Sequence, residues 1–578
     1  MTTLHPVEIE LKLALPAQQA ATFIKLMARR RGVPVQQVLH TRYFDTPDFA
    51  LSAQGIALRV RRVGRRWLQT LKTEGVRSGG LSQRAEYEMA ITRGTPDWSR
   101  FPAEALARVP EALRVQLVPV FETDFSRTTW QLKGQHGAAI EVALDVGEVR
   151  AGSRRQPICE IELELKAGQP DALFELAQGW AQRLDCLPLD VSKAERGVRL
   201  AHDQNPEPIK SVALALDVSM SVEAGFAAMC QACLAQFQAN LPGVLFPLME
   251  PLAIRLSPQA GKSLVIPNPP PQALKDSDPL RAKARAESYA GEHPEGHKGA
   301  NVMPKPIDDI EYVHQARVAL RRLRAALRLY RRVCVPPDAL MEGLRTLTAA
   351  LGPARDWDVL CSETLPPIAP HYPDAAAWQQ GCAALEAHRA EVRASMQADL
   401  MRAHPGAWLL AFQRWLLQRG WRSSPAGGAA PEAQRFVQLS PLVAWARRAL
   451  QKGQRLIVRD ARDFAQLQAA QRHVLRIAIK RQRYAVEFFQ TLFAGYPEGR
   501  KRRLARSLIA LRNAQDSLGR ARDSHMAGEL LTAVQADTGP IGPFVLGWLA
   551  ARLAGATQDE SAGHVRDCLK LKPYFDAG

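Results

Sequence analysis

Several short stretches in the first part of the chain alternate charged and apolar residues. In Glu8-Ile9-Glu10-Leu11-Lys12 the two carboxylates and the ammonium fall on one side of an extended chain, because successive side chains of a strand point to opposite faces. The apolar residues Ile9, Leu11 and Leu13 fall on the other side. The alternation recurs in Leu58-Arg59-Val60-Arg61, Thr70-Leu71-Lys72, Phe125-Ser126-Arg127, Ala143-Leu144-Asp145, 84–88 and 159–165. Each of these stretches predicts a β-strand with one charged face.

One such strand alone would suit a protein surface with a solvated charged face. Repetition favours another interpretation, an antiparallel barrel with a charged interior, since hydrophobic cores do not have this pattern. Burying charges of both signs is costly unless the cavity holds a partner that carries both, such as a metal ion with a phosphate chain. The pattern therefore indicates metal-dependent polyphosphate chemistry.

The inward positions supply candidate site residues of two kinds. Arginine and lysine match phosphate oxygens, and the candidates for binding substrate are Lys12, Arg59, Arg61, Lys72, Arg84, Arg127 and Lys193. Hard divalent cations prefer oxygen ligands, and the candidates for holding metal are Glu8, Glu10, Asp145, Glu160 and Glu162. Glu86 and Glu88 flank Arg84 and are expected to orient it. Glu10 and Lys12 are the catalytic candidates, Lys12 on the hypothesis that neighbouring cations lower its pKa so that it helps to deprotonate water.

Five motifs occur in a fixed order: Glu8-x-Glu10-x-Lys12, Tyr43-Phe44-Asp45-Thr46, Leu58-Arg59-x-Arg61, Glu160-x-Glu162-x-Glu164 and Ser192-Lys193-x-x-Arg196-Gly197. Together they resemble the CYTH superfamily of triphosphate tunnel metalloenzymes. The resemblance implies an eight-stranded tunnel that holds a linear triphosphate with Mg²⁺ or Mn²⁺. It also implies an inorganic triphosphatase, which hydrolyses tripolyphosphate to pyrophosphate and phosphate. A thiamine triphosphatase or a class IV-type adenylyl cyclase would use the same tunnel, and a non-catalytic polyphosphate-binding scaffold would use only its charge.

Composition sets wider limits. The 578 residues are too many for one core, and the net charge of +18 implies an anionic partner. The eight cysteines are scattered, which is typical of reduced thiols, and Cys230-x-x-Cys233 fits two buried helix residues better than a zinc site. No signal-peptide pattern and no 18-residue apolar run occurs. We therefore expect a cytoplasmic protein without a membrane span.

The character of the sequence changes after Leu200. We assign residues 1–202 to the tunnel domain and 203–217, which are polar and contain proline, to a linker. Helical periodicity with many Ala, Leu and Arg residues fills 218–575, with an irregular stretch at 257–309 that we interpret as an insertion or loop. Residues 423–431 separate two helical halves. The predicted fold is therefore an α+β multidomain protein, a β tunnel followed by an all-α domain.

The two helical halves repeat one another. His314-x-x-Arg317 is followed by Arg321 and Arg324 as His473-x-x-Arg476 is followed by Lys480 and Arg483. Downstream, Leu351-Gly352-x-x-Arg355-Asp356 matches Leu518-Gly519-x-x-Arg522-Asp523, which indicates an internal duplication. Spacings of three and four residues place two sets of side chains on helix faces, and we call these sets the basic stripes. The first basic stripe comprises His314, Arg317, Arg321 and Arg324, and the second comprises His473, Arg476, Lys480 and Arg483.

These helices resemble the CHAD domain, the conserved-histidine α-helical domain. The resemblance implies binding of long-chain inorganic polyphosphate and an association with polyphosphate granules. A polyanion that displaces counterions from the basic stripes would bind with strong salt dependence. Nucleic acid is the less favoured partner.

Overall fold

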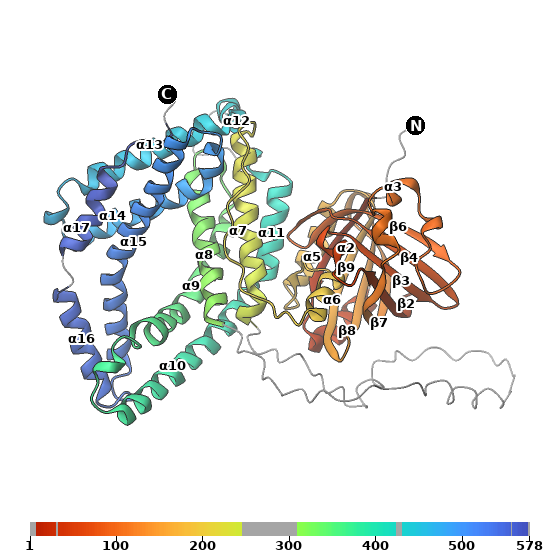
Figure 1. Cartoon of the computed structure of the whole chain (residues 1–578), viewed down its shortest axis with the longest axis horizontal. Helices are drawn as coiled ribbons and strands as arrows, with labels where there is room; N and C mark the ends of the chain where they lie inside the picture. Colours follow the sequence, from red (N-terminus) through yellow and green to blue (C-terminus); the bar gives the residue numbers. More distant parts are fainter. Residues whose placement is uncertain (1–6, 30–32, 246–308, 424–430, 556–557, 576–578) are drawn as a thin grey trace.

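The structure, a computed structural model, describes residues 7–29, 33–245, 309–423, 431–555 and 558–575. Of the predicted insertion at 257–309, all but Asp309 lies outside the described residues, as does most of the 423–431 segment. A β-barrel built from the amino-terminal residues lies beside a helical domain (Figure 1). This is the predicted division into a β domain and an all-α domain.

Eight antiparallel strands close the barrel. They are β1 (Val7–Ala14), β2 (Val35–Asp45), β3 (Ala57–Val63), β4 (Arg66–Lys72), β6 (Leu81–Ile91), β7 (Val118–Lys133), β8 (Ala139–Ala151) and β9 (Arg154–Ala167). Their order around the barrel is β1-β9-β8-β7-β2-β3-β4-β6, and pairing of β6 with β1 closes the ring. Two short strands, β5 (Val76–Ser78) and β10 (Leu187–Pro188), extend the sheet.

The strand register explains the two faces of the alternating segments. Lys12 is paired with Glu162 across β1 and β9, so both side chains point into the barrel. Their neighbours Leu11, Leu13 and Leu163 point outward and are fully buried. Helices α1 (Ala20–Ala28) and α5 (Asp171–Ala181) cover this outer face with Phe23, Phe174 and Trp180.

Four shorter helices complete the barrel domain: α2 (Ala50–Ala53), α3 (Ala103–Leu106), α4 (Glu111–Arg114) and α6 (Lys193–Ala201). Helix α6 contacts β7, β8 and β9, and it begins with a capping box in which Ser192 and Glu195 bind each other's backbone. The cap places Lys193 at the first position of the helix, where it reaches the barrel interior.

The helical domain contains eleven helices in the described part of the chain. They are α7 (Val222–Leu245), α8 (Asp309–Leu329), α9 (Asp338–Val359), α10 (Ala375–Arg402), α11 (Pro405–Leu417), α12 (Pro431–Leu439), α13 (Leu442–Ala461), α14 (Ala469–Phe489), α15 (Glu498–Ala533), α16 (Ile541–Gly555) and α17 (Gln558–Leu569). Helices α7 to α10 correspond to α13 to α16, since each set forms the same series of neighbouring contacts. The two sets meet where α8 contacts α14 and α9 contacts α15.

Residues 203–217 form neither helix nor strand, but they lie along the helical domain. Tyr312 Oη donates to Pro206 O (2.7 Å), and Thr491 Oγ1 donates to Leu214 O (2.6 Å). Leu214 and Leu216 are buried in the main helical core. The predicted linker is therefore an anchored segment.

Two expectations about the whole chain can be compared with the structure. All eight cysteines are unpaired, and Cys230 and Cys233 are buried in α7 as predicted. Among the described residues, no helix combines the length and the apolar character that crossing a membrane requires.

Candidate active site

The barrel encloses a cavity of about 350 Å³ whose lining is mostly charged. All seven predicted substrate-binding cations line it: Lys12, Arg59, Arg61, Lys72, Arg84, Arg127 and Lys193. The carboxylates Glu8, Glu10 and Glu162 also line it. Asp145 and Glu160 are almost completely buried. Lys193, which lines the cavity, forms ion pairs with both of them.

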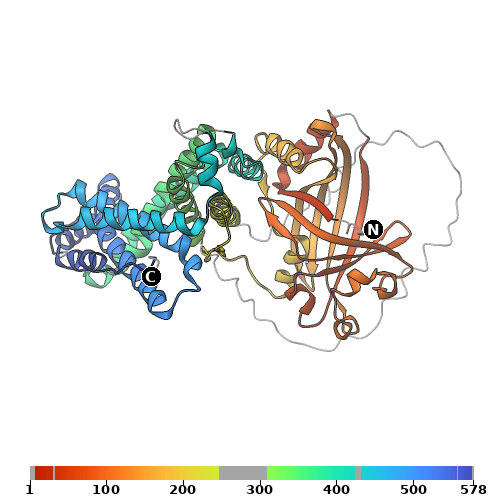
Figure 2. The ribbon, with the colours of Figure 1, turned by 90° about the horizontal axis from the view of Figure 1, so that it is seen from above.

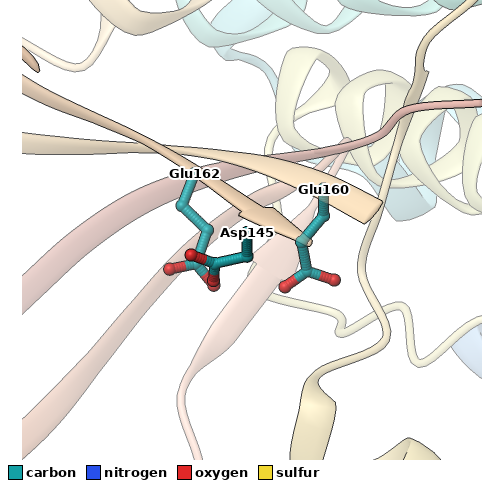
Figure 3. A group of neighbouring side chains, drawn as sticks. All are labelled: Asp145, Glu160 and Glu162. Atoms are coloured by element: carbon teal, nitrogen blue, oxygen red, sulfur yellow. The ribbon is translucent and has the colours of Figure 1, made fainter. Parts of the chain in front are cut away.

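Three of the predicted metal ligands form a compact acidic cluster, Asp145, Glu160 and Glu162, with ligand atoms within 4.8 Å of one another. Asp145 comes from β8 and the two glutamates from β9, and all three carboxyl groups point into the same space (Figure 3). Lys193 Nζ lies 2.6 Å from Asp145 Oδ2 and 2.8 Å from Glu162 Oε1, and it also pairs with Glu160. Arg127 donates to both Asp145 oxygens at 2.7 Å.

The other two predicted ligands, Glu8 and Glu10, lie apart from this cluster on β1. Glu8 accepts from Lys72 Nζ (2.8 Å) and from Arg84 Nε (3.2 Å). Burial alone would raise the pKa of Glu8, but the cations outweigh it and the pKa is lowered. At Glu10, burial and the nearby Glu162 carboxylate raise the pKa to about 7. Two neighbouring carboxylates therefore differ strongly in their affinity for a proton.

Lys12 bridges the two groups of carboxylates. Its Nζ lies 3.2 Å from Glu10 Oε2 and 3.3 Å from Glu162 Oε1. Burial favours the neutral amine, but the two carboxylates prevail and the pKa of Lys12 is raised. The hypothesis of a lowered pKa was wrong because it counted the neighbouring cations and missed the carboxylates that the register brings closer. Lys72 has a lowered pKa, owing to burial and to Arg59 and Arg84.

The expected role of Glu86 and Glu88 also needs correction. Glu86 pairs with Arg59 (3.4 Å) and Lys72 (3.0 Å), and Glu88 accepts from Thr70 Oγ1 (3.1 Å), whereas Arg84 binds the β1 glutamates. Side chains two residues apart on β6 point the same way, but their partners are set by the neighbouring strands.

Some cavity residues were missing from the predicted site. Arg196 pairs with Glu160, and Tyr43 lines the wall, where Arg59, Arg61 and Lys193 outweigh burial and lower its pKa. Both residues stand inside motifs quoted above. Membership of these motifs was the only hint in the sequence that the two residues belong to the site. The spacing of the motifs alone does not distinguish site residues from structural ones.

The acidic cluster suits a hard divalent cation. Its three carboxylates are at most 8% exposed and supply six oxygens, the ligand type that Mg²⁺ and Mn²⁺ take. Their negative charge is already compensated by Lys193 and Arg127, so a bound cation would replace part of that compensation. Glu8 and Glu10 lie on β1, the strand paired with β9, and they are not part of this cluster.

In the helical domain, members of the two basic stripes meet between the repeats. Arg321 of α8 lies near Arg317 on its own helix and near Arg476 and Lys480 of α14. Burial, together with Arg321 and Arg476, lowers the pKa of Lys480 to about 7. Two arginines from the repeated Gly-x-x-Arg-Asp segments, Arg355 and Arg522, join them. We call this set the central basic cluster: Arg317, Arg321, Arg355, Arg476, Lys480 and Arg522.

Other stripe residues behave differently. Arg324 and His473 are exposed, and Arg483 pairs with Glu487 of its own helix. His314 lines a second cavity of about 500 Å³ beside Arg321 and Arg483, and burial together with Arg355 lowers its pKa. Carboxylates offset part of this charge, since Glu487 lies beside the stripes and Asp356 and Asp523 lie close to the central basic cluster.

Comparison with known proteins matches both parts. Residues 7–198 match the family model of the CYTH domain, and residues 302–532 match that of the CHAD domain. The chain joins a CYTH domain to a CHAD domain. The barrel is the CYTH domain, and the duplicated helices that hold the central basic cluster belong to the CHAD domain.

Relatives cover the chain in pieces. An inorganic triphosphatase of Haemophilus influenzae is 37% identical over 203 residues, which is 34% of this chain and 56% of that protein. The chain thus spans about half the length of this curated relative. A solved CHAD domain from the plant Ricinus communis is 26% identical, covers 63% of this chain and 97% of its own, and has a TM-score of 0.43. A candidate adenylyl cyclase from Hippeastrum with a dominant triphosphatase activity is 18% identical over 34% of this chain and 97% of its own, with a TM-score of 0.26.

Proposed function

We propose that the CYTH domain is an inorganic triphosphatase that hydrolyses tripolyphosphate to pyrophosphate and phosphate. The observation that carries this proposal is the cavity itself, in which seven cations from β1, β3, β4, β6, β7 and α6 face one enclosed space. A triphosphate carries enough negative charge to need several such partners. The 37% identity to a protein named inorganic triphosphatase supports it.

The residues that line the cavity have different roles in the proposed reaction. Arg59, Arg61 and Lys72 grip the phosphate oxygens, and Lys12, held in its charged form by its carboxylate neighbours, stabilises negative charge that develops during transfer. The acidic cluster would hold Mg²⁺ or Mn²⁺, and a bound ion would supply Lewis-acid polarisation of a phosphoryl group and a lowered pKa of water. Lys193 and Arg127 orient Asp145 and Glu162 and lower the pKa of both carboxyl groups, which keeps them ionised.

The cavity lining favours a bare phosphate chain over a nucleotide or thiamine triphosphate. Tyr43 is the one aromatic residue among the described residues that line it, and its ring stacks on Phe121. A base or thiazole ring would need an apolar or stacking surface. An assay with Mg²⁺ that compares hydrolysis of tripolyphosphate, ATP and thiamine triphosphate tests the proposal. The proposal fails if tripolyphosphate is not the preferred substrate.

We also propose that the CHAD domain binds long-chain inorganic polyphosphate through the central basic cluster. Six cations from four helices meet there, and burial and mutual repulsion lower the pKa values of Arg317, Arg476 and Lys480. An array of like charges at such a junction is unfavourable unless an anion compensates it. A flexible polyanion can follow both repeats and release its counterions.

Charge reversal of Arg317, Arg321, Arg476 and Lys480 together in the full chain tests this second proposal. Polyphosphate binding should be lost, while wild-type binding should weaken steeply with added salt. Reversal of four exposed cations outside the cluster, Arg448 and Arg455 of α13 with Arg502 and Arg506 of α15, is the matched control. If duplex DNA binds equally well at the same salt concentration, the domain binds polyanions in general and not polyphosphate specifically.

A further inference from the structure

The helical domain is packed into the wall of the barrel. Ala407 and Leu410 of α11 belong to the same hydrophobic cluster as Leu11 and Leu13, the outward residues of β1. A Cβ atom added to Gly406 would lie 2.0 Å from Cys186 O, so the α11 backbone touches the barrel domain directly. Figure 2 shows α11 and α5 lying between the two domains.

Two buried glutamines of the helical domain reach the barrel loops beside this contact. Gln238 of α7 donates Nε2–H to Asp190 Oδ2 (2.8 Å). Gln413 of α11 accepts from Ser78 Oγ (3.3 Å) and packs against the β5–β6 turn, since a Cβ added to Gly79 would lie 2.4 Å from its Cγ. Both glutamines are at most 5% exposed.

From Asp190 a ring of hydrogen bonds encloses the backbone of Lys12. Asp190 Oδ1 accepts from Gly80 N–H (2.7 Å), and Gly80 O accepts from Lys12 N–H (2.9 Å). Lys12 O accepts from the N–H of Leu189 (2.9 Å), the residue before Asp190. Gly80 has φ +85° and no room for a Cβ, which would lie 2.7 Å from Lys12 O. The ring therefore tolerates little displacement.

The same loop leads into α6 and the second inward lysine. Ser192 caps α6 two residues after Asp190, and Lys193 follows at once into the acidic cluster. Arg77 of β5 binds Glu195 Oε2 (2.7 Å), the carboxylate that completes the cap. Asp190 is thus linked to the backbone of Lys12 through Gly80 and lies three residues before Lys193. These two lysines both contact Glu162.

We propose that Asp190 is a positioning residue: held by Gln238 of the helical domain, it sets the positions of Lys12 and Lys193 in the tunnel. Full turnover in the CYTH domain then depends on a side chain of the helical domain. This inference rests on the proposed triphosphatase function, because turnover is one of its two readouts. Misplacing a catalytic group by about 1 Å can cost roughly a hundredfold in rate.

Four variants of the full chain test the proposal. Asp190→Ala and Gln238→Leu should each lower kcat on tripolyphosphate about tenfold or more, with a smaller change in KM, because five other cations still grip the substrate. Asp190→Asn should restore most of kcat, since its Oδ1 still accepts from Gly80 and its amide can donate to Gln238 Oε1, which lacks a hydrogen-bond partner among the described residues. Gln418→Ala, which removes another interface glutamine bonded to Asp171, should leave kcat unchanged.

Hydrogen exchange supplies a readout independent of turnover. In Asp190→Ala the amide of Lys12 should exchange faster than in the wild type, whereas Asp190→Asn should protect it. Unchanged exchange in Asp190→Ala, equal losses of kcat in the Ala and Asn variants, or a loss in Gln418→Ala would overturn the proposal. If the wild type does not hydrolyse tripolyphosphate, the proposed function fails, and the exchange result still decides whether Asp190 positions Lys12.

Discussion

In the tunnel, most inward cations are paired with a carboxylate from another strand. Lys12 of β1 meets Glu162 of β9, and Lys72 of β4 meets Glu8 of β1. Such pairs offset part of the cost of burying each charge. A triphosphate with its divalent cation offers both signs of charge, so it can replace these partners without leaving buried charges uncompensated.

Glu162 is the residue in which most of these contacts converge, since it meets Lys12, Arg127 and Lys193. Glu162→Gln should lower turnover on tripolyphosphate by several orders of magnitude, because an amide is a poor ligand for a hard cation. Steady-state kinetics measure the effect, with circular dichroism to verify the fold. Glu122→Gln on the outer face of β7 is the matched control and should behave as wild type. Near-normal turnover in Glu162→Gln would contradict the assignment.

Arg61 differs from the other tunnel cations, because no ion pair to it occurs among the described residues. It donates to Thr41 Oγ1 (3.0 Å), and burial with Arg59 and Arg127 lowers its pKa. Arg61→Met should therefore weaken tripolyphosphate binding at least tenfold while raising the free energy of unfolding by about 1 kcal/mol.

Calorimetric titration and chemical denaturation measure the two effects of Arg61→Met. The neighbouring Arg62 is exposed on the same strand, and Arg62→Met should change neither quantity by much. Unchanged affinity in Arg61→Met would show that this guanidinium does not meet the substrate.

At the scale of elements, the packing of α8 against α14 concentrates charge. Lys480 of α14 faces Arg321 of α8 and Arg522 of α15, with Arg476 and Arg483 on its own helix. Helix α14 alone would supply only Arg476 and Arg483, whereas Arg321 comes from the other repeat and Arg522 from α15.

Polyphosphate binding should consequently depend on pH. The folded pKa of Lys480, about 7, lies below its ordinary value of 10.5, so the folded protein loses this proton as pH rises through 7. Affinity should fall between about pH 6.5 and 8.5, and the free energy of unfolding should rise between 7 and 10.5, where the unfolded chain binds more protons.

Binding titrations across this pH range test the effect. Lys480→Arg should flatten the pH dependence of affinity, because a guanidinium stays charged. His314, whose pKa is lowered from 6.5, titrates below this range. A wild-type affinity that is constant from pH 6.5 to 8.5 would contradict the prediction.

At the scale of the whole molecule, α11 joins the two domains, and we expect them to unfold as one cooperative unit. Arg414 donates to both carboxylate oxygens of Asp171 at 2.7 Å, beside the shared apolar cluster of Ala407 and Leu410. An interface of this kind, in which a helix of one domain completes the core of the other, couples their unfolding.

Gly406→Ala should lower the free energy of unfolding by about 2 kcal/mol, because its Cβ would overlap Cys186 O and push α11 from the barrel. Scanning calorimetry should show one transition for the wild type and separated transitions for this variant. Gly179→Ala in the exposed face of α5, where a Cβ meets nothing within 4 Å, should stabilise by about 0.5 to 1 kcal/mol. Two resolved transitions in the wild type would contradict the coupling.

Two features could be read from the amino-acid pattern alone, the faces of the strands and the duplication of the helices. Alternation of side chains follows from the local geometry of an extended backbone, so Glu8, Glu10 and Lys12 could be assigned to one face without any knowledge of the fold. The repeated Arg-Asp segments at Arg355 and Arg522 could also be recognised from the sequence. Their membership of the central basic cluster could not.

Which charges meet depends on contacts between segments that are distant in the chain. The pairing of Lys12 with Glu162, and hence the raised pKa of Lys12, depends on the register between β1 and β9, which lie far apart in the chain. Glu10 lies opposite Glu164 in this register and stays outside the acidic cluster, and the contact of Gln238 with Asp190 follows from the docking of the helical domain. Electrostatic interactions fall off with distance and depend on burial, and neither quantity is a property of a residue's place in the sequence.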